Sequence, residues 1–199
     1  MTEKIELLGL SKTELAGQVA ALGEKPFRAK QLWQWLYYHG VTDFGQMSSF
    51  SKELRAKLAE NFTITRPKIV AEQVSVDKTH KWLLEFADGQ RVEMVYIPEE
   101  DRGAVCISTQ VGCAMGCRFC HTGSQKLTRN LTAGEIVGQF MVARDVYGEW
   151  PTRTDENRML SNIVVMGMGE PLDNYRNVLD FLTILSSPEG RNLSLRHVS

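Results

Sequence analysis

The chain has 199 residues, of which 43% are hydrophobic, 24% charged and 9% aromatic. These values are typical of a globular protein with a buried core, and they exclude a low-complexity chain or a disulfide-stapled miniprotein. The formal charge of −1 excludes coating of nucleic acid by bulk charge but allows a local basic face. No apolar run approaches the roughly 20 residues of a membrane span, and the N-terminus lacks a secretory signal. We therefore expect a cytoplasmic protein with reduced thiols and no membrane partner.

Three helical patterns occupy residues 11–61. Ser11 and Glu14 have the spacing of a capping box, and Gly23 is a typical helix stop, so they bound the first helix. The second helix is expected to start near Pro26 and to end before Gly40. The third is expected to start after Ser51. The predicted helices span residues 11–22, 26–39 and 52–61.

Three short segments rich in β-forming residues follow, at 69–76, 80–86 and 91–97. Asp88-Gly89 lies between the last two and is a strong signal for a hairpin turn. These segments predict a small antiparallel sheet. Together with the helices, they predict an N-terminal accessory domain over residues 1–98.

From residue 99 onward, strands and helices alternate. Strands are expected at 105–110, 162–166 and 193–199, and helices at 132–147 and 174–185, with a polar loop over 148–161. This alternation predicts an α/β fold with a parallel sheet or barrel. The second domain, 99–199, stops inside a predicted strand, so we expect its barrel to be incomplete in this chain.

Three of the four cysteines, Cys113, Cys117 and Cys120, have C-x3-C-x2-C spacing in a loop that contains glycine. Closely spaced thiolates of this kind hold iron–sulfur clusters, and three of them leave one iron of a [4Fe–4S] cluster open to another ligand. A zinc site completed by Cys106 or His121 is the alternative. The chain lacks the second C-x2-C pair of ordinary zinc modules, which favours iron–sulfur.

A second candidate site follows the predicted strand at 162–166, where the chain reads Gly-Met-Gly-Glu-Pro. A strand end with little side-chain bulk lets a ligand approach the backbone at Gly169. Glu170 can accept hydrogen bonds from an ammonium group. Alone, this pattern is equally typical of an ordinary turn, and the nearby cysteine loop favours a ligand site.

The cysteine spacing, with Phe119 before the last cysteine, resembles the radical S-adenosylmethionine (SAM) enzymes. In those enzymes the open iron chelates SAM, and the reduced cluster cleaves SAM to a 5′-deoxyadenosyl radical. The resemblance implies that Gly169 and Glu170 contact the amino group of SAM. It also implies an electron donor such as flavodoxin or ferredoxin.

Residues 91–98, 106–113 and 167–171 resemble the RlmN family of adenine-C2 RNA methyltransferases. The resemblance implies a partial (β/α)6 radical-SAM barrel, preceded by the accessory domain, in a monomer. It implies methylation of adenine 2503 in 23S ribosomal RNA and adenine 37 in some transfer RNAs, using two SAM molecules and a methyl-cysteine. It further implies a general base at Glu93 and an adduct-resolving cysteine, acting through a transient disulfide, at Cys106. How these two divide the proton-acceptor role stays open.

In that family the methyl-carrying cysteine belongs to a region beyond Ser199, and no cysteine follows Cys120 here. We therefore expect a fragment that is inactive alone. Two other functions remain: a Cfr-type enzyme that modifies C8 of adenine, and a zinc-stabilised RNA-binding module without catalysis.

One stretch supports an RNA partner independently of the resemblance. The residues from 102 to 134 include four basic and no acidic side chains; the basic ones are Arg102, Arg118, Lys126 and Arg129. A local excess of four positive charges would attract phosphates. A solvated loop face is the alternative.

Overall fold

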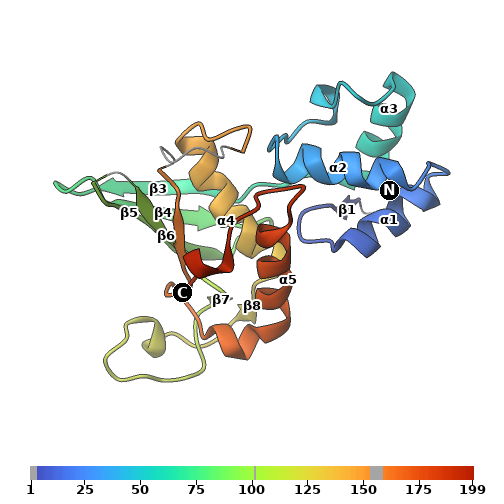
Figure 1. Ribbon diagram of the computed structural model, residues 1–199. Coiled ribbons are helices and arrows are strands. Elements are labelled where there is room, and N and C mark those ends of the chain that lie inside the picture. The colour runs from blue at the N-terminus through green and yellow to red at the C-terminus, as the bar shows by residue number, and fades with distance from the viewer. Residues whose placement is uncertain (1–3, 101, 153–158) are drawn as a thin grey trace.

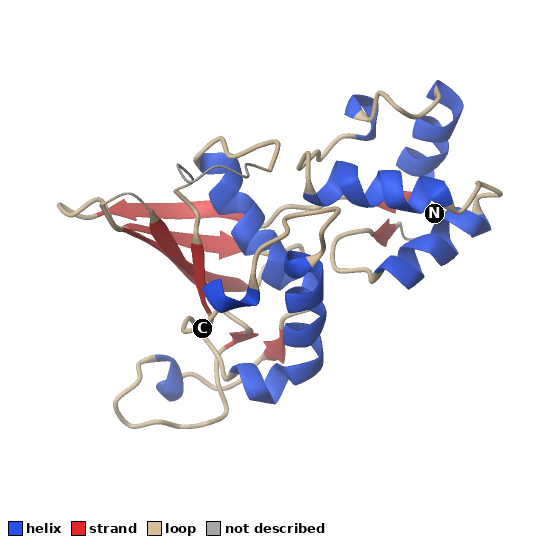
Figure 2. Cartoon of the chain, viewed as in Figure 1, coloured by secondary structure: helices blue, strands red, loops and turns tan. Residues whose placement is uncertain are grey.

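The computed structural model describes residues 4–100, 102–152 and 159–199. The polar loop expected over 148–161 therefore lies partly outside the described residues. The accessory helices stand on one side of the molecule and a sheet on the other, with two further helices between them (Figures 1 and 2). None of the described helices has the length and apolar character needed to cross a bilayer.

The accessory helices form where the sequence predicts them. They are α1 (Lys12–Ala21), α2 (Phe27–Tyr37) and α3 (Lys52–Asn61). The capping box of α1 is confirmed, because the Glu14 N–H donates to Ser11 Oγ at 3.2 Å and the Ser11 N–H donates to Glu14 Oε2 at 2.8 Å. Strands β1 (Ile5–Glu6) and β2 (Phe62–Thr63) pair in parallel and close this unit.

The main sheet has five strands in the order β3-β4-β5-β6-β9. Strands β3 (Lys68–Val74), β4 (His80–Glu85), β5 (Arg91–Pro98) and β6 (Gly103–Cys106) are antiparallel to their neighbours, whereas β9 (Asn162–Val164) runs parallel to β6. The expected antiparallel segments thus belong to the same sheet as the first barrel strands. The division at residues 98 and 99 stays a prediction, and β5 pairs with β6 across it.

One face of this sheet is buried against helix α4 (Ala133–Val146). Tyr147, at the end of α4, contacts Trp82 and Tyr96, with ring centroids 6.3 and 4.5 Å apart. Alternate residues on β4 and β5 are almost fully buried; they are Trp82, Leu84, Val92, Met94 and Tyr96. Because side chains alternate along a strand, the residues between them lie on the opposite face. Helix α5 (Tyr175–Ser186) packs beside α4.

Two of the strand predictions need correction. The strand expected at 105–110 is divided: β6 ends at Cys106, and β7 (Gln110–Val111) pairs instead with β8 (Arg129–Asn130). The strand expected at 193–199 is wrong for Leu195–His197, which form a 3₁₀ turn. Ser194 caps that turn by accepting a hydrogen bond from the Arg196 N–H, which holds the backbone away from β9. Pairing with β9 begins only at Val198, opposite Ile163.

Backbone contacts join the accessory unit to α4. A side chain at Gly9 would have its Cβ 2.3 Å from the backbone nitrogen of Gly134, so the two glycines allow a close approach. Arg144 of α4 is buried, and its guanidinium donates to the Glu149 carbonyl at 2.6 Å and to Thr152 Oγ1 at 2.9 Å. The Thr152 N–H donates to the Tyr38 carbonyl at 2.8 Å. These contacts attach α2 to the barrel segment.

Candidate active site

Glu93 and Cys106 lie on the same face of the sheet. The register pairs Val95 with Cys106, and Glu93 lies two residues before Val95 on β5, so all three side chains point to the face opposite α4. Glu93 and Cys106 are thus diagonal neighbours on adjacent strands, a relation that places Cβ atoms roughly 7–8 Å apart. The two residues expected to act on the substrate share one surface.

Ser108 connects this face to the Gly-Met-Gly-Glu segment. Its hydroxyl donates to the Glu93 carbonyl at 2.7 Å and accepts from the Met168 N–H at 2.9 Å. The Gly167 N–H donates to the Ile107 carbonyl at 3.0 Å. The segment that follows β9 is therefore fixed against the segment that follows β6, at the carboxyl ends of two parallel strands. Ligand sites of parallel α/β folds gather at such ends.

Gly169 and Glu170 are held by Gln110. Gly169 has φ of +100°, and a Cβ there would lie 2.5 Å from the Cβ of Gln110, so only glycine fits. The Glu170 N–H donates to Gln110 Oε1 at 2.8 Å. The Glu170 carboxylate accepts from the Leu172 N–H at 3.0 Å and so caps the 3₁₀ turn Pro171–Asn174. Its other oxygen accepts no hydrogen bond from the described residues, which leaves it for a ligand ammonium group.

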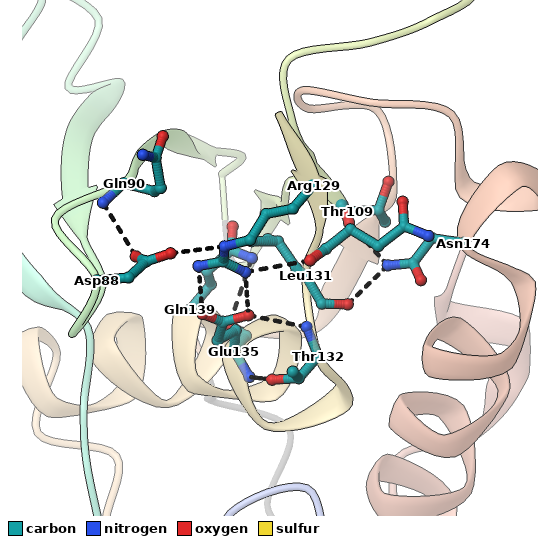
Figure 3. Close-up of polar contacts among 10 residues, drawn as sticks. Asp88, Gln90, Thr109, Arg129, Leu131, Thr132, Glu135, Gln139 and Asn174 are labelled. Carbon is teal, nitrogen blue, oxygen red and sulfur yellow. Dashed lines mark hydrogen bonds and ion pairs between the residues drawn. The ribbon is translucent and has the colours of Figure 1, made fainter. Parts of the chain in front are cut away.

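Gln110 is fully buried and serves three partners at once. Besides its bond to Glu170, its amide nitrogen donates to Asn130 Oδ1 at 2.7 Å and to Asp173 Oδ2 at 2.9 Å. Asn174, also buried, donates to the carbonyls of Thr109 and Leu131 at 2.8 and 2.7 Å (Figure 3). Buried amides with all partners satisfied fix a loop in one conformation. These positioning residues are absent from the sequence prediction.

Arg129 joins three segments around the same region (Figure 3). Its guanidinium makes two hydrogen bonds to Glu135, at 2.7 and 2.8 Å, and one to Asp88 at 2.7 Å. Glu135 belongs to the capping box that Thr132 forms at the start of α4. The hydrogen bonds that Glu135 accepts raise the pKa of Arg129; burial opposes this rise, and the hydrogen bond that Asp88 accepts adds to it. The β4–β5 turn, β8 and α4 are thereby linked.

The environment of Cys106 keeps its thiol protonated. Burial raises the pKa of this thiol, because the thiolate would lose hydration; the N–H of Met166 donates to the sulfur and offsets part of that effect. Cys106 lies within the sheet, paired with Val95 and Val164. Its neighbours are therefore sheet residues, which disfavours its expected alternative role as a zinc ligand beside Cys113.

The three other cysteines lie on a long loop between β7 and β8, seen as the yellow loop in Figure 1. Cys113 is partly buried, and Cys117 and Cys120 are exposed; all are free thiols. Among the described residues, no three Cys, His, Asp or Glu side chains are gathered as a ready metal site. The loop thus brings the cysteines into one segment without bringing their sulfur atoms together.

The chain is similar to known proteins over almost all of its length. A family profile described as the ribosomal RNA large subunit methyltransferase N-terminal domain matches residues 5–64. The dual-specificity RNA methyltransferase RlmN of Rhodospirillum rubrum is 60% identical over 195 residues, which cover 98% of this chain and 46% of that protein. Its counterpart in Acidiphilium cryptum is 58% identical over 197 residues, covering 98% and 50%.

A crystal structure of a radical SAM methyltransferase from Sphaerobacter thermophilus matches with a TM-score of 0.86 and 41% identity, covering 98% of this chain and 55% of that one. The chain belongs to the RlmN family. It spans about half the length of the curated relatives that it matches. The mixed α/β fold, a partial barrel of the radical-SAM type, is likewise confirmed.

The cysteine loop of this RlmN-family chain fits an iron–sulfur cluster by the chemistry of its donors. Three free thiols lie within one loop, and thiolates are the ligands that such clusters use. A Cβ at Gly123 would lie 2.6 Å from the Cys117 carbonyl, so the loop folds closely on itself beside the middle cysteine. An open cavity of about 270 Å³ lies against Cys113 and Gly116. Space for a bound group therefore lies beside Cys113.

The prediction of a local excess of four positive charges at residues 102–134 is wrong. Carboxylates outside the 102–134 stretch pair with two of its basic residues: Glu99 with Arg102, and Asp88 with Arg129. Glu135 also pairs with Arg129. The remaining two, Arg118 and Lys126, are exposed on the cysteine loop and make no ion pair with the described carboxylates. Fewer basic side chains of this stretch are therefore left to attract phosphate than the sequence predicts.

Proposed function

We propose that this chain is the N-terminal and first-barrel part of a radical SAM methyltransferase acting on C2 of adenine in RNA. The observation that carries the proposal is the placement of Glu93 and Cys106 on one sheet face, beside the strand-end loop that contains Gly169 and Glu170. The target bases are adenine 2503 of 23S ribosomal RNA and adenine 37 of some transfer RNAs. The enzyme acts in the cytoplasm as a monomer.

Two sets of residues hold the cofactors in this proposal. Cys113, Cys117 and Cys120 bind the [4Fe–4S] cluster through their thiolates, and Gly169 and Glu170 bind the amino group of SAM. When bound and reduced by a flavodoxin- or ferredoxin-type donor, the cluster supplies the electron that cleaves SAM. Glu170 is already oriented by Gln110, so binding the ammonium group requires little rearrangement of its backbone.

The raised pKa of Cys106 supports a proposed division of roles between Cys106 and Glu93. Because burial raises that pKa, Cys106 is a thiol at neutral pH and is a poor proton acceptor. Glu93 is half-exposed on the same face and therefore takes the proton from C2 of adenine. Once its own proton has been removed, the Cys106 thiolate attacks the sulfur of the methyl-carrying cysteine in the C-terminal portion. The disulfide forms as the bond from that sulfur to the adduct carbon breaks, and the released carbon takes up a proton to become the C2 methyl group.

One contact with RNA is expected at the cysteine loop. Arg118 and Lys126 are exposed there, on the loop that carries the cluster ligands. Two side chains contribute a modest, salt-dependent attraction for phosphate. We therefore assign most of the RNA affinity to surfaces outside this pair.

Analysis of methylated nucleosides tests the proposed function. The chain, extended to the full length of its relatives and loaded with iron and sulfide without oxygen, is incubated with SAM, a reductant and ribosomal or transfer RNA. We expect 2-methyladenosine by mass spectrometry. With Cys106→Ala, we expect the protein–RNA adduct to accumulate with little free product. Formation of 8-methyladenosine would instead assign the C8 reaction, and absence of any methylated adenosine would contradict the proposal.

A further inference from the structure

Lys81 has a specific place on the face that carries Glu93 and Cys106. Its Nζ lies 2.6 Å from Glu93 Oε1, and the side chains of both residues are about half exposed. The register places Lys81 opposite Val95, which in turn lies opposite Cys106. Lys81 and Cys106 therefore belong to one row of side chains across three strands, and Glu93 lies in the next row.

We propose that Lys81 is a positioning residue that holds the Glu93 carboxylate in the orientation needed for proton transfer. The proposal rests on the proposed function, in which Glu93 is the base. Without a partner, a half-exposed glutamate samples several side-chain rotamers. The contact with Lys81 selects the rotamer that keeps the carboxylate over the row containing Cys106. Lys81 itself need not touch the substrate.

The neighbouring residues on this face indicate that Lys81 is the residue that orients Glu93. On the adjoining row, Arg91 and Glu85 pair with each other at 2.6 Å. The residue of β3 opposite Lys81 is the uncharged Gln73. Among the described residues, Lys81 is the basic side chain in ion-pair contact with Glu93.

The contact between Lys81 and Glu93 adds little to the stability of the sheet. An exposed ion pair of one lysine and one glutamate contributes little to stability, because solvent screens it. The fold of β4 and β5 is already fixed by a continuous antiparallel ladder from His80↔Tyr96 to Glu85↔Arg91. Loss of the Lys81 side chain should therefore leave the sheet intact and affect the orientation of Glu93.

Carbodiimide coupling tests the contact without requiring activity. In the full-length chain before cluster loading, coupling should join Lys81 to Glu93 through an amide bond that mass spectrometry detects. The internal standard is Lys12 with Glu189, whose atoms are 2.5 Å apart. Coupling of the standard without coupling of Lys81 to Glu93 would overturn the proposal.

The functional test compares variants of two similarly exposed lysines. Lys81→Met should slow release of 2-methyladenosine about tenfold and increase the trapped protein–RNA adduct, whereas Lys81→Arg should restore most of the rate because it keeps charge and reach. Lys57→Met is the matched control: it removes a similarly exposed lysine that lies 3.9 Å from Glu24. It should change neither quantity.

A double-mutant comparison completes the test. In a Glu93→Gln background, Lys81→Met should have no further effect on adduct release, since the carboxylate that it positions is gone. Equal effects of Lys81→Met in both backgrounds, or a wild-type rate in Lys81→Met, would overturn the proposal. A wild-type chain that makes no methylated adenosine would instead overturn the proposed function.

Discussion

Gly169 occupies a position where a side chain cannot be added without displacing Gln110. Its φ of +100° is unfavourable for any L-residue with a Cβ, and the nearest side-chain atom would lie at 2.5 Å. The same Gln110 receives the Glu170 N–H. A change at Gly169 should therefore be transmitted directly to the carboxylate proposed to bind SAM.

The variant Gly169→Ala should lower the free energy of unfolding by about 1–3 kcal/mol and weaken SAM binding at least tenfold. Gly17→Ala is the matched control, because Gly17 lies inside α1 with no atom within 4 Å of an added Cβ. The control should raise stability by roughly 0.5–1 kcal/mol, since alanine favours a helix. Urea unfolding and equilibrium dialysis of SAM measure the two effects. Equal stability of both variants would contradict the account.

Other residues show why a single sequence reveals only part of the site. The spacing of the cysteines is visible in the sequence itself, and the family resemblance suggests a role for Glu93. Gln110 reads as one more polar residue near a strand end, and its burial and three partners arise only when β7, β8 and the segment after β9 meet. Lys81 is similarly ordinary in sequence, because its relation to Glu93 depends on the register of two strands.

At the scale of elements, Arg129 holds together parts that are distant in the chain. It connects the β4–β5 turn through Asp88 and the start of α4 through Glu135. Its side chain is 28% exposed, less than that of Arg91, which is 55% exposed and pairs with Glu85. A partly buried guanidinium with two carboxylates is worth more than an exposed ion pair.

The variant Arg129→Met should lower the free energy of unfolding by about 1–3 kcal/mol, because Asp88 and Glu135 lose a shared partner. Arg91→Met should change it by less than about 1 kcal/mol. Urea unfolding followed by tryptophan fluorescence measures both. Two variants with the same stability would show that the Arg129 cluster is no stronger than a surface ion pair.

The helices were more predictable than the strands for a physical reason. Capping boxes are local signals: the one expected at Ser11 forms, and Thr132 forms another at the start of the helix expected at 132–147. Strand ends depend on partners elsewhere in the chain. The run at 105–110 begins with β-forming residues, yet Ser108 directs its hydroxyl to Glu93 and Met168, and the strand is divided there into β6 and β7. The turn at Leu195–His197 likewise follows from the cap at Ser194.

At the scale of the whole molecule, one sheet carries both predicted domains. The strands expected in the accessory domain continue through β6 into β9. This continuity matters for the proposed function, because Glu93 comes from the first group and Cys106 from the second. If the accessory domain had a sheet of its own, Glu93 and Cys106 would lie in different domains. The RlmN-family resemblance predicted the partial barrel, whereas the pattern of residues did not predict that one sheet unites both parts.

The most direct test of the central claim is the metal content of the chain, extended to the length of its relatives and prepared without oxygen. We predict about four iron and four sulfide ions per chain, with the brown absorbance of a [4Fe–4S] cluster. Cys117→Ala should lose both, and Cys106→Ala should keep both. A colourless wild-type protein that binds one zinc ion through four of its own side chains would contradict the account.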